Sequence, residues 1–366
     1  MKHNWTYKKL GDVCKVNSGK GIAAELISPN YSPSLFPCYG GNGIRGYVKT
    51  PSHNGVHPII GRVGALCGNV HLAKGEFYAT EHALIVTITD NGVNPEWLSF
   101  LLKYKDLSKI AKGVAQPVIS ASEVMKQELP MPSLDEQQAI VRELDGINRL
   151  IDLQEEQLRE YDRLAQSLFY TTFGDPATNP KGWEVKKLGE VAEVVGGSTP
   201  KTSEEKNWIG TNNWISPAEI KDDDKYISST ERCISDDAAS HLQLLPIGTV
   251  LLSSRAPIGK LAITRIPMYC NQGFKNIVCG KTLNNEYAYW YMKFNVGRLQ
   301  EMGVGATFKE VSKTIVSAFP IMLPPLALQQ SFAAQIEAIE QQKALIRRSL
   351  DDTRTLLAAR MQYYFE

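Results

Sequence analysis

The sequence predicts an α+β fold in which two similar globular regions are joined by two long antiparallel coiled-coil helices, with internal pseudo-two-fold symmetry. Two observations predict it: the opening segment of the chain recurs in its second half, and each copy ends in a long polar stretch without proline. Six cysteines without a C-x-x-C pair, no signal peptide and no apolar run of about 18 residues indicate a cytoplasmic protein with free thiols.

The internal repeat divides the chain into two domains of similar design. The motif W-x-x-K-K-L-G-[DE]-V begins at Trp5 and again at Trp183, 178 residues later. Near the end of each copy the distance is 192 residues, as for Gln137 and Gln329. The second copy therefore carries about 14 extra residues, which we expect in surface loops. We expect the two tryptophans, which occupy equivalent positions, to anchor the cores.

Each copy begins with a mixed region of strands and turns. Short apolar runs at residues 83–88 and 250–252, separated by Gly-rich segments, predict strands, and a helical patch follows at residues 95–102 and again at 286–292. The expected domains are residues 1–133 (first globular domain), 134–174 (first long helix), 175–325 (second globular domain) and 326–366 (second long helix).

The two polar stretches, from about Leu134 and from about Leu326, predict long helices. Ser133 and Glu136 form a capping box, and Gly174 follows the first helix. Apolar residues recur in steps of four and three, which indicates a coiled-coil seam, although an ordinary amphipathic surface helix is the alternative. The seam positions are Ile140, Leu144, Ile147, Ile151, Gln154, Leu158, Tyr161, Ala165 and Leu168, then Phe332, Ile336, Ile339, Lys343, Ile346, Leu350, Thr353 and Leu357. Both seams contain polar interruptions, and we expect the helices to pair with each other antiparallel.

Charge is distributed unevenly along the chain, although the net charge is only +1. The first globular region carries +5 and the first helix −5, while the second globular region carries +1 and the second helix 0. This excludes a uniformly basic protein that coats nucleic acid, but it permits local basic loops that contact phosphates. A normal solvated surface explains the charges equally well.

Catalytic signatures are missing from the sequence. There is no phosphate-binding P-loop, no H-E-x-x-H, no G-x-S-x-G, no [DN]-P-P-[YFW] tetrapeptide, and no G-x-G-x-x-G between a strand and a helix. We therefore predict no catalytic residues, no cofactor and no metal site. Two alternatives stay open: a fused methyltransferase or nuclease with unrecognised motifs, and a coiled-coil adaptor that does not bind DNA.

The order and duplication of these motifs resemble the specificity subunit of type I restriction-modification systems, over nearly the whole chain. The motifs are the repeated W-x-x-K-K-L-G-[DE]-V, Y-G-G-N-G-I-R-G-Y from Tyr39, G-R-V-G-A-L-C-G-N-V from Gly61, N-Q-G-F-K from Asn271 and G-A-T-F-K from Gly305. The resemblance implies a non-catalytic subunit whose two target recognition domains each read half of a bipartite double-stranded DNA target. It also implies that the long helices set the half-site spacing. The implied partners are two methyltransferase (modification) subunits and a restriction/translocase subunit, and no association with a membrane is expected.

Candidate DNA-binding side chains lie in Gly-flanked loops, where the backbone can approach phosphate closely. Arg and Lys suit guanine edges, and Asn and Gln suit adenine edges. The candidates are Lys20, Asn42, Arg45, Arg62, Asn69, His71 and Gln116 in the first domain, and Lys201, Thr202, Ser254, Arg255, Lys260, Asn271, Gln272, Lys275, Thr307 and Lys309 in the second. Alternatively, Arg62 and Arg255 brace the fold, because Gly61-Arg62 and Ser254-Arg255 begin what we take to be corresponding strand–turn segments.

Overall fold

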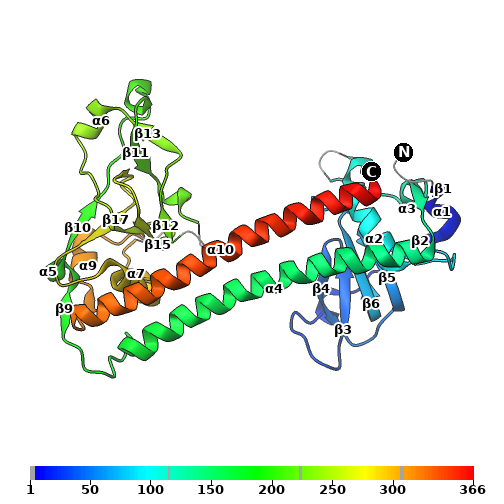
Figure 1. The fold of residues 1–366 in the computed structure, drawn as a ribbon, viewed down its shortest axis with the longest axis horizontal. Coiled ribbons are helices and arrows are strands. Elements are labelled where there is room, and N and C mark those ends of the chain that lie inside the picture. Colours follow the sequence, from blue (N-terminus) through cyan, green and yellow to red (C-terminus); the bar gives the residue numbers. More distant parts are fainter. Residues whose placement is uncertain (1–4, 114–115, 222–224, 306–308) are drawn as a thin grey trace. The chain divides into compact units, whose positions relative to one another are not determined.

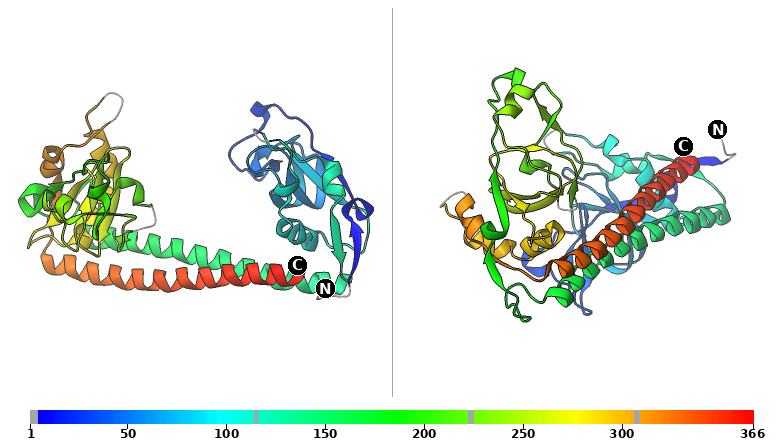
Figure 2. Two further views of the ribbon diagram at one scale, coloured as in Figure 1. Left: turned by 90° about the horizontal axis from the view of Figure 1, so that it is seen from above. Right: turned by 60° about the vertical axis from the view of Figure 1, so that its left-hand side comes forward.

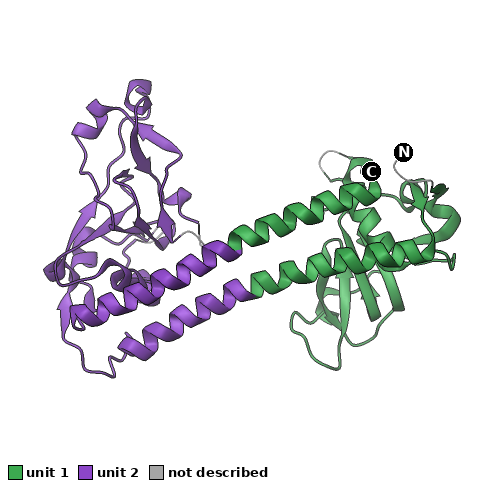
Figure 3. Ribbon diagram, viewed as in Figure 1, with its two compact units in different colours: residues 1–156, 347–366 green, residues 157–346 purple. Residues whose placement is uncertain are grey.

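The structure is a computed structural model that describes residues 5–113, 116–221, 225–305 and 309–366. It divides into two compact units, shown in two colours in Figure 3. Unit 1 contains Met1–Glu156 and Arg347–Glu366, and unit 2 contains Gln157–Ile346. Each unit therefore combines one globular region with a segment of each long helix.

Unit 1 is built around one six-stranded sheet. The strands of unit 1 are β1 (Thr6–Lys9), β2 (Cys14–Ser18), β3 (Phe36–Gly40), β4 (Gly43–Val48), β5 (His53–Gly61), β6 (Val70–Ala79), β7 (Ala83–Ile88) and β8 (Glu128–Met131). Its helices are α1 (Leu10–Val13), η1 (Ala24–Leu26), α2 (Pro95–Tyr104), η2 (Leu107–Ile110), α3 (Ala121–Met125), and parts of α4 (Leu134–Phe173) and α10 (Leu326–Phe365). The sheet has the order β2-β7-β5-β6-β3-β4, and β1 pairs separately with β8. Figure 1 shows the labelled strands β5, β6, β3 and β4 of this sheet.

Unit 2 repeats this design, except that the pairing of β4, β3 and β6 recurs there as a separate small sheet. Its strands are β9 (Val185–Lys187), β10 (Ala192–Gly196), β11 (Asn212–Ile215), β12 (Tyr226–Ile227), β13 (Arg232–Ile234), β14 (Val250–Ser254), β15 (Ile258–Thr264), β16 (Tyr269–Cys270), β17 (Lys275–Cys279) and β18 (Pro320–Met322). Its further helices are α5 (Leu188–Val191), η3 (Glu205–Trp208), η4 (Pro217–Glu219), α6 (Asp236–Ser240), α7 (Asn285–Phe294), α8 (Val296–Glu301) and α9 (Lys313–Ala318). The main sheet has the order β10-β17-β14-β15-β12, the small sheet has the order β13-β11-β16, and β9 pairs with β18.

The strand order confirms that the two units share one fold. The order β2-β7-β5-β6 in unit 1 recurs as β10-β17-β14-β15 in unit 2, antiparallel in both cases. A helix capped by asparagine follows in each copy: the Asn94 side chain accepts from Trp97 N, and the Asn284 side chain accepts from Tyr287 N. Trp97 and Tyr287 are fully buried at equivalent places in the two cores. The predicted fold class is confirmed.

The long helices α4 and α10 are each 40 residues long, with the ends that the sequence predicts. Ser133 N donates to Glu136 Oε2 (2.8 Å) and Glu136 N to Ser133 Oγ (3.4 Å), so the capping box is present. Every predicted seam residue is buried or half-buried.

The seam pairs the helices antiparallel within each unit, where they run side by side in all views (Figure 2). In unit 1, Gln154 Nε2 donates to Ser349 Oγ (2.8 Å), and Arg360, further along α10, binds Glu143, which lies earlier in α4. In unit 2, the polar interruption Lys343 contacts Asp162 of α4 across 2.5 Å. Each polar interruption of the seam thus makes a hydrogen bond or an ion pair, although the buried Oε1 of Gln154 has no partner among the described residues.

A buried glutamine fastens each long helix to its own globular region. Gln137 Nε2 donates to Gly92 O (2.8 Å) and Pro132 O (3.0 Å), and its Oε1 accepts from Asn94 N (2.8 Å). Gln329, 192 residues later, makes the same three kinds of hydrogen bond with the second globular region. Both side chains are fully buried, so the repeated pair of glutamines marks a structural contact that occurs twice.

The six cysteines are all free thiols. Burial raises the pKa of Cys14, Cys270 and Cys279 to about 12, so these thiols stay protonated and unreactive. Within residues 5–113, 116–221, 225–305 and 309–366, no helix has both the length and the apolar character of a membrane span.

Candidate nucleic-acid interface

Loops of unit 1 that are distant in sequence gather at one end of its sheet. We call them the first loop cluster, which comprises residues 19–21, 41–45, 61–71, 79–82, 112–113 and 116–118. Backbone hydrogen bonds join them, including Gly64 N to Pro117 O (3.0 Å) and Arg62 N to His82 O (2.8 Å). At Gly61 a Cβ atom would lie 2.1 Å from Gly41 O, so only glycine permits the two turns to approach this closely.

Three predicted residues of the first domain meet around the turn between β3 and β4. Asn69 Nδ2 donates to Asn42 Oδ1 across 2.9 Å, and both side chains are exposed. The His71 ring lies beneath Gly43 of the same turn, 3.0 Å from where its Cβ would be. Desolvation by burial, followed by the charge of Lys103, lowers the pKa of His71, so the ring is neutral near pH 7. The amide pair faces solvent, whereas His71 supports the turn from below.

The other four candidates of the first domain belong to the same cluster. Arg62 is half-buried and its Nη1 donates to Glu81 O (3.3 Å), which fixes the guanidinium beside the turns. Arg45 and Gln116 are exposed in β4 and in the last loop of the cluster. Lys20 is exposed, and its backbone N–H donates to Ala79 O (3.0 Å). The structure therefore brings all seven predicted residues of the first domain into one region.

In unit 2 the corresponding loops form a second cluster. This second loop cluster comprises residues 198–202, 216–217, 254–258, 271–275 and 309–310. The Thr199 hydroxyl donates to Gln272 Oε1 and accepts from Asn271 Nδ2 (3.0 Å), and Gly273 N donates to Asn271 Oδ1 (2.6 Å). Gln272 is exposed while Asn271 is half-buried, so Asn271 orders the loop that presents Gln272.

Three candidates of the second domain serve as braces in this structure. Lys260 Nζ donates to two backbone carbonyls, Pro217 O (3.2 Å) and Ile220 O (2.7 Å). Lys275 Nζ donates to Ser254 Oγ (3.2 Å) and lies 3.5 Å from Glu310 Oε1, with 14% of the side chain exposed. Ser254 is fully buried. A DNA contact by any of the three would require these bonds to break, so we regard them as positioning residues.

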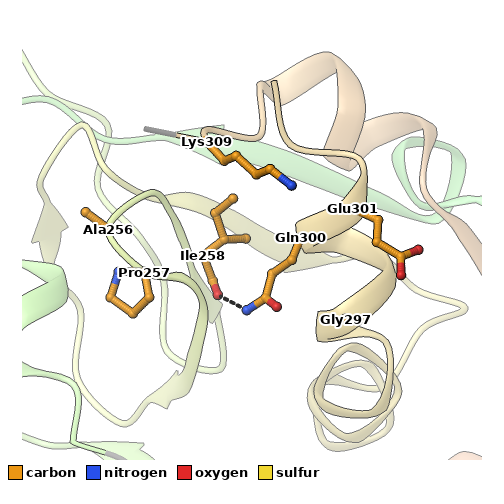
Figure 4. Close-up of a pocket in the computed structure, with 7 residues that line it drawn as sticks. All are labelled: Ala256, Pro257, Ile258, Gly297, Gln300, Glu301 and Lys309. Carbon is orange, nitrogen blue, oxygen red and sulfur yellow. Dashed lines mark hydrogen bonds between the residues drawn. The ribbon is translucent and has the colours of Figure 1, made fainter. Parts of the chain in front are cut away.

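The remaining candidates of the second domain keep exposed or half-exposed side chains. Arg255 is half-buried next to Gly273, and Lys309 is exposed. Lys309 also lines a pocket of about 560 Å³ with Ala256–Ile258 and α8, where Gln300 Nε2 donates to Ile258 O (Figure 4). Lys201 and Thr202 are exposed, and Lys201 Nζ contacts Glu204 (3.3 Å). Thr307 lies outside the described residues.

The two arginines expected to correspond do not occupy equivalent positions. In unit 1 the backbone carbonyl of Arg62 accepts from Ile119 N (2.9 Å), whereas in unit 2 the carbonyl of Ser254 accepts from Val311 N (3.0 Å). Ser254 therefore replaces Arg62, and Arg255 follows it by one residue. In both segments an arginine follows an apolar strand, so sequence alone aligns Arg62 with Arg255. This alignment is wrong by one residue.

One polar contact near the second loop cluster joins residues that no sequence pattern relates. Arg232 stacks on Trp208, with Cζ 3.4 Å from the ring centre. Trp208 and Trp214 lie in the extra segment of the second copy, and two tryptophans in one inserted segment are a sequence signal for a binding surface. No sequence pattern, however, relates Arg232 to them. Among the described residues, no group of three His, Cys, Asp or Glu side chains is placed to hold a metal ion.

Comparison with known proteins gives consistent matches. The family model "Type I restriction modification DNA specificity domain" matches residues 2–161 and 180–352. The EcoprrI specificity subunit of Escherichia coli is 43% identical over 144 residues, which cover 39% of this chain and 36% of that protein. The MjaIX specificity subunit of Methanocaldococcus jannaschii is 38% identical over 159 residues, covering 42% and 37%. The matched parts thus span little more than a third of these two relatives.

A solved structure shares the fold over nearly the whole chain. The S subunit of a type I restriction-modification system from M. genitalium superposes with a TM-score of 0.66 at 15% sequence identity, covering 99% of this chain and 96% of that one. At this identity the likeness concerns the fold alone.

Proposed function

Because the chain belongs to the family of type I restriction modification DNA specificity domains, we propose that it is the DNA-recognition subunit of a type I restriction-modification complex and has no catalytic activity of its own. It acts in the cytosol with two methyltransferase subunits and a restriction/translocase subunit. Each globular domain reads one half of a bipartite double-stranded DNA target.

One observation carries this proposal: a repeated framework presents different side chains. The sheet order and the buried glutamines recur in both units, whereas the loop clusters differ. Asn42 and Asn69 present an amide pair in the first, and Gln272 is exposed beside Arg255 in the second. Bases are distinguished by side chains that enter a groove, so two different clusters on one framework suit an asymmetric bipartite target.

The long helices set the distance between the half-sites in this proposal. An inserted heptad lengthens a helix by about 10 Å and keeps the seam in register. We expect one heptad after Glu156 and one after Ile346 to lengthen the spacer of the methylated motif by about three base pairs, because each base pair adds about 3.4 Å. Replacing seven existing residues there without changing the length is the control. An unchanged spacer in the insertion variant would contradict the role in spacing.

Matching exposed leucines on the helices support two copies of one partner. Leu153 is 61% exposed and Leu345, 192 residues later, is 62% exposed. Leu164 and Leu356, also 192 apart, are 51% and 49% exposed. Each unit carries one leucine of each pair, so each offers the same apolar positions to a docking subunit. We assign these positions to the two methyltransferase subunits.

The decisive test is methylome sequencing of a host that carries this gene together with the methyltransferase gene. We expect one bipartite motif that depends on both genes. The methyltransferase gene alone serves as the control and should give no such motif. Methylation of the same motif without this gene, or stoichiometric S-adenosylmethionine binding by the isolated chain, would contradict the proposal.

A further inference from the structure

Unit 2 contains an arginine that lies flat against a tryptophan at the edge of its small sheet. Arg232 is the first residue of β13, and its Cζ lies 3.4 Å from the Trp208 ring centre and 5.3 Å from that of Trp214. The two indole rings are 5.0 Å apart and nearly perpendicular. Arginine over the face of tryptophan is the most favourable cation–π geometry, and it orients the guanidinium plane.

The aromatic pair is fixed beside the second loop cluster. Trp214 is buried and its Nε1 donates to Ser198 O (3.1 Å). Trp208 Nε1 donates to Lys201 O (3.3 Å). Both acceptors belong to the loop that contains Thr199, whose hydroxyl contacts Gln272. Arg232 therefore lies next to the surface that we assign to reading DNA, on a rigid support.

The guanidinium edge remains open to a ligand. Arg232 is exposed, and none of the ion pairs that the structure gives for the described residues includes it. Stacking occupies one face of the guanidinium, whose N–H donors all lie in its plane. A planar pair of N–H donors matches O6 and N7 of guanine in the major groove.

The charges nearby favour a base edge over a phosphate. The segments beside Arg232 carry the carboxylates of Glu204, Glu205, Asp236 and Asp237. Lys201 and Lys206, which both contact Glu204, offset only part of this negative charge. The Asp236 carboxylate already accepts from Asn212 Nδ2 (2.8 Å). These negative charges repel phosphate but affect the neutral edge of a base much less.

We propose that Arg232, held flat by Trp208, reads a guanine in the major groove of the half-site recognised by the second domain. This inference rests on the proposed function. The small sheet of unit 2 is then a reading element whose counterpart in the first domain is formed by β4, β3 and the end of β6, and Trp208 is a positioning residue for Arg232.

The experiment compares methylomes of hosts in which the methyltransferase subunit is combined with wild-type, Arg232→Ala, Arg232→Lys, Trp208→Leu or Arg265→Ala chains. Arg265 is the matched control, because it is exposed and stacks on Tyr226 at 3.9 Å at the opposite end of β15 from the second loop cluster. We expect Arg232→Ala to relax one G·C position by about tenfold or more, with the other half-site and the spacer unchanged. Arg232→Lys and Trp208→Leu should relax the same position, and Arg265→Ala should leave the motif intact.

Several results would overturn the inference. An additional Asn42→Asp variant of the first domain identifies the half-site that the second domain reads, because that half-site should stay unchanged. If the wild-type motif has no G·C pair in that half-site, the inference is refuted while the proposed function stands. An Arg232→Ala motif identical to wild type, with a lowered unfolding temperature of the assembled complex, would show that Arg232 is only a structural brace. Loss of all methylation with all three variants would also refute it, because one lost base contact does not abolish binding. Absence of any motif that depends on this gene would remove the proposed function itself.

Discussion

The two units hold their helices alike at the ends and differently in the middle. At the start of each helix a buried glutamine makes the same hydrogen bonds, and at the end Phe365 packs on Trp97 of unit 1 as Phe173 packs on Tyr287 of unit 2. Between these points, the position of the half-buried Ile151 in unit 1 corresponds to that of buried Lys343 in unit 2.

Unit 2 has a buried charge cluster at this place. Lys225 Nζ lies 2.5 Å from Glu286 Oε2 and 3.9 Å from Glu340 Oε1, while Lys343 Nζ lies 3.7 Å from Glu340 and 2.5 Å from Asp162. Desolvation lowers the pKa of Lys225, although the two glutamates oppose the shift. Lys225 precedes β12, which joins the main sheet of unit 2 beside β15.

Unit 1 instead joins its helices by a partly exposed group. Arg360 Nη2 donates to Glu143 Oε2 (2.9 Å), and the Tyr364 hydroxyl donates to the same oxygen (2.5 Å). The equivalent positions in unit 2 are Gln335 and Leu168. The comparison teaches that the duplicated framework is kept where a helix enters or leaves a domain, while the middle has adapted to each domain.

The largest expected effect is at the buried charges. We expect Lys225→Met to lower the free energy of unfolding by about 3–5 kcal/mol, because it leaves Glu286 buried without its cation. Lys343→Ile, which restores the residue type of unit 1, should cost about 1 kcal/mol or less, because the Asp162 side chain is 59% exposed and can be hydrated. Denaturant unfolding of the variants measures both, and equal losses would show that the burial of the partner carboxylate does not determine the cost.

The buried glutamines come next. We expect Gln137→Leu and Gln329→Leu each to lower the free energy of unfolding by about 2–3 kcal/mol, since each leaves one backbone N–H and two carbonyls unpaired. Urea unfolding monitored by hydrogen exchange in each unit measures the two changes separately. Exposed Gln138→Leu and Gln330→Leu are the controls. A large loss in one unit and none in the other would break the proposed equivalence.

Partner docking should be weakened less, and equally, in the two copies. We expect Leu153→Ser and Leu345→Ser each to reduce the affinity for the methyltransferase subunit about tenfold, through lost apolar burial of about 1–2 kcal/mol. Leu150→Ser is the control, because Leu150 is 47% exposed but glutamine stands at the equivalent position 342. Calorimetric titration gives the affinity and the stoichiometry, and one partner per chain would argue against two docking sites.

The smallest effect concerns acid stability in unit 1. The hydrogen bond from Arg360 lowers the pKa of Glu143 below its ordinary value of 4.5. A depressed carboxyl pKa stabilises the fold above the ordinary value, and this stabilisation disappears as the pH falls through the depressed pKa. Glu143→Gln should therefore cost about 0.5–1 kcal/mol at pH 7, and this difference should shrink below pH 4.5. Gln335→Glu, the reverse change at the equivalent position of unit 2, should give no gain in stability. Thermal unfolding at pH 7 and below pH 4.5 measures the effect of both variants.

The helices and the repeat could be predicted from sequence because their signals are local. The capping box at Ser133, the glycine after Phe173 and the steps of four and three define both ends and the buried face of α4. The candidate loops of the first domain were found from their glycines, and the structure places Gly61 where its backbone passes close to Gly41. These features depend on neighbours within a few turns or on one small residue.

The tertiary structure alone decided which polar side chains remain available. Lys260 and Lys275 belong to the same residue types as Arg255 and Lys309, yet oxygens far away in sequence occupy their ammonium groups. The contact of Arg232 with Trp208 joins residues that no periodicity relates. Sequence by itself determined a duplicated framework and its two long helices, because hydrophobic periodicity and caps are written in consecutive residues. Which side chains face a ligand depends on hydrogen bonds between distant loops, and these exist only after the chain has folded.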